Sequence, residues 1–127
     1  MTAHGLRRAW GAVTIVLAAV IFIQAGFAGA MLSGVAWARP AHALTAAALI
    51  ASTLAAGLVA LLALRRTPHG LRLGLTLAAL AAVAILQAAL GKLSAHGPNL
   101  MWVHVPLGVA LLGLAMQAAA GARRLGG

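Results

Sequence analysis

Four long apolar stretches, separated by short segments that are polar or rich in glycine and proline, organise the chain. They cover about residues 10–33, 42–64, 73–94 and 100–120. A helix needs roughly 20 apolar residues to cross the hydrocarbon core of a bilayer, and these runs lack the alternation of a half-buried strand. Inside lipid, only helices and closed barrels satisfy the backbone hydrogen bonds. The pattern predicts an all-α fold, an integral membrane four-helix bundle in which residues 1–127 form one domain.

Positive charges are concentrated at one end of the predicted helices. Seven of the nine Lys and Arg residues flank the start of the first helix, the connection between the second and third, or the end of the fourth: Arg7, Arg8, Arg65, Arg66, Arg72, Arg123 and Arg124. Only Arg39 and Lys92 lie near the two other connections. Because loops rich in Lys and Arg stay in the cytoplasm, both termini are predicted to be cytoplasmic, in a multi-pass protein of the cell membrane.

Composition narrows the possible chemistry. Hydrophobic residues make up 64% of the chain and charged residues 7%, whereas about a quarter of a soluble domain is charged. The absence of Cys excludes disulfides and thiolate ligands, and the absence of Asp and Glu excludes carboxylate acid–base catalysis and carboxylate-bound metals. This argues against an enzyme. The net charge of +9 is spread between apolar runs, which favours a lipid bilayer rather than nucleic acid as the partner.

One polar pattern occurs twice. A glutamine and a glycine lie late in an apolar helix, an outer connection follows, and a histidine begins the next helix. The first copy contains Gln24, Gly29 and His42, and the second contains Gln87, Gly91 and His104. The spacing from glutamine to histidine is 18 residues in the first copy and 17 in the second. This pattern predicts a bundle built from two repeated helix hairpins.

The two repeated histidines are candidate metal ligands. His42 and His104 begin the second and fourth predicted helices, which run in the same direction and lie at similar depth near the outer face. In an up-down bundle these helices are diagonal, about 14 Å apart if neighbouring axes are about 10 Å apart. Two inward imidazoles on such a diagonal leave room for one metal, and histidine is a common axial ligand of haem. We therefore expect His42 and His104 to ligate haem b.

Other polar residues near this end have two possible roles. Arg39 and Lys92 are partners for the anionic haem propionates or ordinary headgroup anchors. His96, in the second outer connection, is an alternative ligand but has no counterpart in the first half. His4 and His69 lie among arginines at the opposite end and are expected to be solvated.

The glycines and glutamines of the repeat also have two possible roles, in contact with a cofactor or in helix packing alone. Gly29 and Gly91 belong to stripes of small residues, which leave space for a flat macrocycle or let helices pack closely without one. Gln24 and Gln87 lie deeper in the membrane, on the first and third predicted helices. They are expected to form interhelical hydrogen bonds, with contact to haem or a quinone as the alternative.

Two segments carry a family resemblance: Ile85-Leu86-Gln87-Ala88-Ala89-Leu90-Gly91, and Trp102-Val103-His104 with its apolar continuation. Together they resemble one four-helix half of the haem A synthase family, in which histidine pairs ligate haem. The resemblance covers about residues 21–121 through short motifs, and it is looser in the first copy. The family has a glutamate four residues before its first histidine, where this chain has Ala38. The resemblance implies a haem-holding bundle without the oxidation chemistry of the synthase.

Three functions from different classes follow. The first is a membrane b-type haem protein for electron transfer, with a quinone or a respiratory membrane protein as partner. The second is a cofactor-free membrane subunit or assembly scaffold, in which the histidines only pack. The third, a small multidrug-type transporter, lacks the membrane-embedded carboxylate that couples such transport to protons. Each is compatible with a homo-oligomer.

Overall fold

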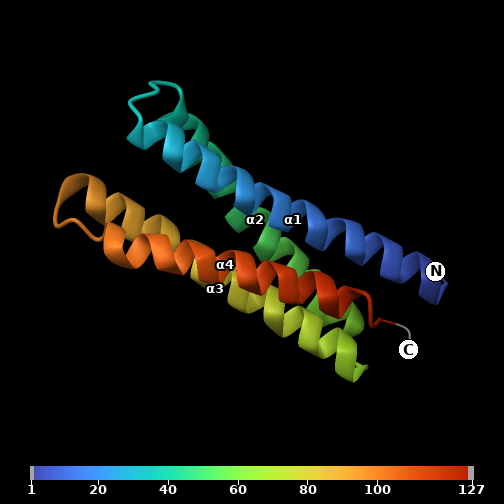
Figure 1. The fold of residues 1–127 in the computed structure, drawn as a ribbon. Coiled ribbons are helices and arrows are strands. Elements are labelled where there is room, and N and C mark those ends of the chain that lie inside the picture. The colour runs from blue at the N-terminus through green and yellow to red at the C-terminus, as the bar shows by residue number, and fades with distance from the viewer. Residues whose placement is uncertain (1, 126–127) are drawn as a thin grey trace.

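The computed structural model describes residues 2–125, and these form four α-helices (Figure 1). The helices are α1 (Ala3–Leu32), α2 (Ala38–Leu64), α3 (Pro68–His96) and α4 (Met101–Ala122). No strand occurs among the described residues. The all-α fold predicted from the apolar runs is therefore confirmed.

Three of the helices begin earlier than the apolar runs predicted, because their first turns are polar. Thr2 and Thr67 precede α1 and α3, and their hydroxyls accept hydrogen bonds from the backbone N–H groups of Gly5 and Gly70. These contacts satisfy amide donors that would otherwise lack a partner in the first turn of a helix. Pro40 lies within the first turn of α2, where its missing N–H costs nothing. Hydropathy locates the segment that fits the bilayer, whereas the capping threonines decide where α1 and α3 start.

The helices form a ring in chain order. α1 is the backbone neighbour of α2 and α4, and α3 is the backbone neighbour of the same two helices. Among the described residues, the backbones of α1 and α3 do not come within 8 Å of each other, nor do those of α2 and α4. The diagonal placement expected for the helices that carry His42 and His104 is confirmed. Figure 1 shows the α1–α2 and α3–α4 connections standing apart at one end, while both chain ends lie at the other. We refer to these two ends as the hairpin end and the terminal end.

The outside of the bundle is strongly apolar. Each of the four helices is long and apolar enough to cross a membrane. Large hydrophobic side chains point outward along all of them, including Phe22, Leu44 and Val109, each about 70% exposed. A surface of this kind is stable in lipid and not in water, so the fold is that of a multi-pass membrane protein.

The apolar core is confined to the terminal half and the middle of the bundle. Its last layer toward the hairpin end consists of Ile21, Leu49, Ala84 and Leu111, one from each helix. Beyond this layer, Ala38 is the only buried apolar residue among those described. The interior of the hairpin end is therefore left to other residue types.

Candidate functional site

Polar side chains follow the last apolar layer toward the hairpin end: two glutamines lie about one turn beyond it and two histidines about two turns beyond it. The heptad-like series of buried positions on each helix continues to Gln24 on α1, His42 on α2, Gln87 on α3 and His104 on α4. Gln24 is buried, and the other three are half-buried. All four helices thus contribute one polar side chain to the interior at the same end. We call this set the polar layer.

Gln24 joins α1 to α2 beside His42. Its side-chain Nε2 donates to the Thr45 hydroxyl at 2.8 Å and to the backbone carbonyl of His42 at 3.2 Å. The Thr45 hydroxyl in turn donates to the carbonyl of Ala41 at 2.7 Å. This agrees with the interhelical hydrogen bond expected of Gln24, and it fixes the first turns of α2 against α1.

α3 and α4 meet through two reciprocal contacts between a polar side chain and a glycine. A Cβ added to Gly91 on α3 would lie 3.4 Å from Cε1 and 3.9 Å from Nδ1 of His104 on α4. A Cβ added to Gly108 on α4 would lie 3.0 Å from Nε2 of Gln87 on α3. Each helix therefore offers a glycine surface to the polar side chain of the other. Gly91 lies against the imidazole of His104, a contact between two residues of the second copy of the sequence pattern.

Four polar atoms of this layer are buried without a hydrogen-bond partner. They are Oε1 of Gln24 and of Gln87, and Nδ1 of His42 and of His104. Leaving a buried donor or acceptor unsatisfied costs about 1–3 kcal/mol, and native proteins contain few such groups. The four atoms come from four different helices, and all of them lie at the hairpin end.

Gly29 does not take the place that Gly91 takes in the second hairpin. It is exposed, and nothing lies within 4 Å of a Cβ built on it. Since each residue turns a helix by about 100°, Gly29 lies about 140° around α1 from Gln24. The stripe of small residues to which Gly29 belongs therefore faces away from the polar layer.

The remaining predicted residues are exposed. Arg39, in the first turn of α2, and Lys92 and His96, near the end of α3, lie at the hairpin end with the polar layer. His4 and His69 begin α1 and α3, so they lie at the opposite end of the bundle. The structure thus places Gln24, His42, Gln87, Gly91 and His104 at the hairpin end, with Arg39 and Lys92 at the surface of the same end.

Thr45 is the residue of this region that the sequence pattern missed. It lies three positions after His42, on the same face of α2, and its hydroxyl receives the Gln24 amide. The second copy has Leu107 at the matching position after His104, so comparison of the two copies gave no signal for it.

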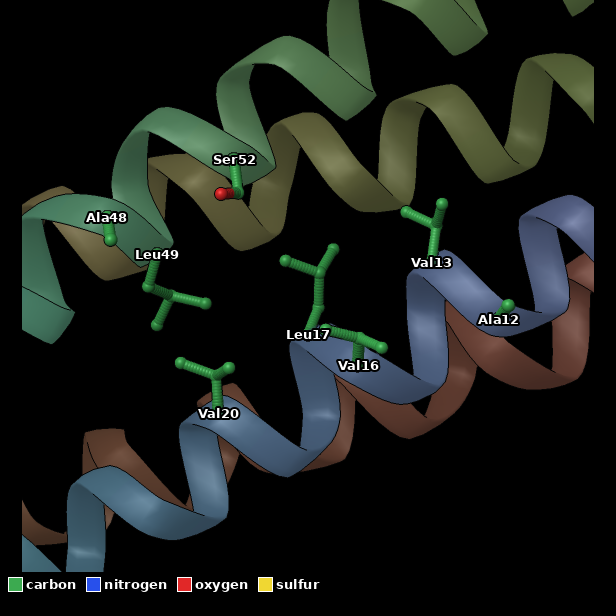
Figure 2. Close-up of a pocket in the computed structure, with 8 residues that line it drawn as sticks. All are labelled: Ala12, Val13, Val16, Leu17, Val20, Ala48, Leu49 and Ser52. Atoms are coloured by element: carbon green, nitrogen blue, oxygen red, sulfur yellow. The ribbon is translucent and has the colours of Figure 1, made fainter.

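Outside this layer, the structure has a groove between α1 and α2 (Figure 2), which begins one turn below Gln24. Its volume is about 370 Å³, and its lining is apolar except for Ser52: Ala12, Val13, Val16, Leu17, Val20, Ala48 and Leu49. It contains no titratable side chain and no metal ligand. The hairpin end is therefore the better candidate for a cofactor.

Comparison with protein-family models, curated proteins and solved structures finds no match to this chain. Its function therefore has to be argued from the polar layer itself.

Proposed function

We propose that this chain is a b-type haem protein of the cell membrane that transfers electrons, with His42 and His104 as the axial ligands of the iron. The observation that carries the proposal is the group of four buried, unpartnered polar atoms at the hairpin end, two of them on these imidazoles. Coordination of iron by the two imidazoles would offset this cost at the histidines. A plain packing layer would be expected to consist of small or apolar side chains.

The donor set fits haem better than a bare metal ion. The chain has no Cys, Asp or Glu, so histidine is the only strong protein ligand present. Two imidazoles leave a zinc or iron ion with an incomplete ligand set, whereas a porphyrin supplies four nitrogens in a plane and needs only axial ligands. His42 and His104 lie on diagonal helices, so they approach the interior from opposite sides.

The surrounding residues fit the same group. Arg39 and Lys92 are the cations of the hairpin end, and no carboxylate side chain in the sequence neutralises them. They are available to bind the propionates of the haem at the membrane surface. When bound, haem supplies one-electron redox chemistry. His42 and His104 would hold its iron, Gln24 would fix the first turns of α2 that carry His42, and Gly91 would leave space for the His104 imidazole.

We also propose that the bundle consists of two repeated hairpins with both termini in the cytoplasm. The repeat is supported by the positions that are buried. Gln24 and Gln87 are 63 residues apart, and the same shift carries the five other buried positions of α1 onto buried positions of α3: Trp10, Thr14, Leu17, Ala18 and Ile21 onto Leu73, Leu77, Leu80, Ala81 and Ala84. A shift of 62 residues, as from His42 to His104, carries Leu49, Thr53, Gly57 and Ala60 onto buried Leu111, Ala115, Ala119 and Ala122. Duplication of a hairpin would produce this register.

The test is a reduced-minus-oxidised visible spectrum of the purified protein after expression with haem supplied. We expect a low-spin haem spectrum, lost in His42→Ala and in His104→Ala. His4→Ala and His69→Ala are the matched controls, because these histidines lie at the other end of the bundle and should leave the spectrum unchanged. Loss in His96→Ala together with retention in His42→Ala would replace the proposed ligand pair. If the wild-type protein binds no haem, the proposal fails in favour of a cofactor-free membrane subunit.

A further inference from the structure

The terminal end of the bundle has a large excess of positive charge that no side chain of the protein neutralises. Seven arginines lie at this end, and all are exposed: Arg7, Arg8, Arg65, Arg66, Arg72, Arg123 and Arg124. The sequence contains no Asp or Glu, so none of them forms an ion pair with a side chain of this protein. The compensating negative charge has to come from outside the chain.

One of these arginines, Arg72, lines a groove on the surface of the bundle. Arg72 lies at the edge of a shallow groove of about 480 Å³ between α3 and α4. The groove is lined by Pro68, Leu71, Leu75, Thr76, Ala79 and Leu114 in addition to Arg72. The Thr76 hydroxyl donates to the carbonyl of Arg72 at 2.9 Å, so it is already satisfied. Arg72 is the one polar group of the groove that still needs a partner.

The groove combines one positive charge with an apolar lining, which is complementary to a molecule with an anionic head and an apolar tail. Arg72 is four residues into α3, about 6 Å along the axis from its start, and Ala79 is about 10 Å further toward the middle of the bundle. A guanidinium therefore lies near the depth of the headgroups, with apolar side chains following it along the helix into the hydrocarbon. Guanidinium binds phosphate with charge-assisted, often bidentate hydrogen bonds.

We propose that this groove is a binding site for an anionic phospholipid, whose phosphate contacts Arg72 and whose acyl chain lies along Leu75, Ala79 and Leu114. A second copy of the chain does not fit the groove as well, because it also lacks Asp and Glu and so brings no side-chain carboxylate to Arg72. The site lies at the opposite end of the bundle from the polar layer and is independent of haem binding.

The experiment is native mass spectrometry of the full-length protein in a nonionic detergent, titrated with phosphatidylglycerol or with phosphatidylcholine. We expect wild-type protein to retain phosphatidylglycerol preferentially. Arg72→Gln should weaken this binding about tenfold, the loss expected for one charge-assisted hydrogen-bonded contact. Arg8→Gln is the matched control: it removes the same charge from the same end but lies outside the groove, and should change the affinity less than about twofold.

A second variant tests the acyl-chain part of the site. Ala79→Phe fills the groove without changing charge, so it should weaken both lipids while the far-ultraviolet circular dichroism spectrum remains helical. Equal losses in Arg72→Gln and Arg8→Gln would assign the preference to the general positive field and overturn the proposal. So would the absence of any preference for phosphatidylglycerol, equal competition by glycerol phosphate, which has no acyl chain, or a change of oligomeric state in Ala79→Phe with lipid binding unchanged.

Discussion

Gly91→Leu provides a direct test of the contact between α3 and the His104 imidazole. A Cβ at position 91 would lie 3.4 Å from Cε1 of His104, which is an ordinary van der Waals contact. Alanine therefore fits at this position. The three further carbons of leucine extend beyond the Cβ toward the imidazole, so the ring or α3 has to move.

The size of the effect follows from overpacking. Inserting carbons into a filled interior costs about 1–3 kcal/mol, which raises the equilibrium constant for unfolding about 5- to 140-fold. Gly29→Leu is the same substitution at the corresponding glycine of the first hairpin, where nothing lies within 4 Å of the built Cβ. A change at such an open position is expected to stay within about 0.5 kcal/mol. Because both glycines lie inside helices, the gain in helix propensity is similar and cancels in the comparison.

The assay is reversible unfolding of the purified protein in mixed micelles, followed by circular dichroism, for wild type, Gly91→Ala, Gly91→Leu and Gly29→Leu. We expect Gly91→Leu alone to lower the free energy of unfolding by more than about 1 kcal/mol. Equal destabilisation by the two leucine variants would refute the argument that His104 lies against Gly91 and that Gly29 faces open space.

Three further predictions concern other parts of the bundle. Gly70→Ala should destabilise the α2–α3 connection strongly, since its Cβ would collide with the backbone and side chain of Leu64, and limited proteolysis should then cleave there first. Gln24→Leu and Thr45→Val should each cost about 0.6–1.7 kcal/mol in unfolding measurements, and the double variant should cost less than the sum because both remove one hydrogen bond. Reporter fusions at the C-terminus should read cytoplasm and those at Gly97 the outside; the reverse would overturn the orientation.

Two features of the candidate site could not be predicted from the repeat pattern, because they depend on contacts between helices. Gly29 and Gly91 have matching places in the sequence pattern, but in the structure only Gly91 lies against a histidine side chain. The reason is rotational: Gly91 follows its glutamine by four residues, about 40° around the helix, whereas Gly29 follows by five, about 140° around. Thr45 had no counterpart in the second copy, so only the packing of α1 on α2 identified it as the partner of Gln24.

The sequence by itself determined the fold class, because four apolar runs of this length have no stable form in a bilayer other than helices. It also selected His42 and His104, since two histidines at repeated positions in an otherwise apolar chain are conspicuous. Only the tertiary structure decided which polar atoms are left without partners at the hairpin end, and that Arg72 borders a groove. Both depend on how side chains from different helices meet, and a pattern along one helix records the direction of a face but not what lies opposite it.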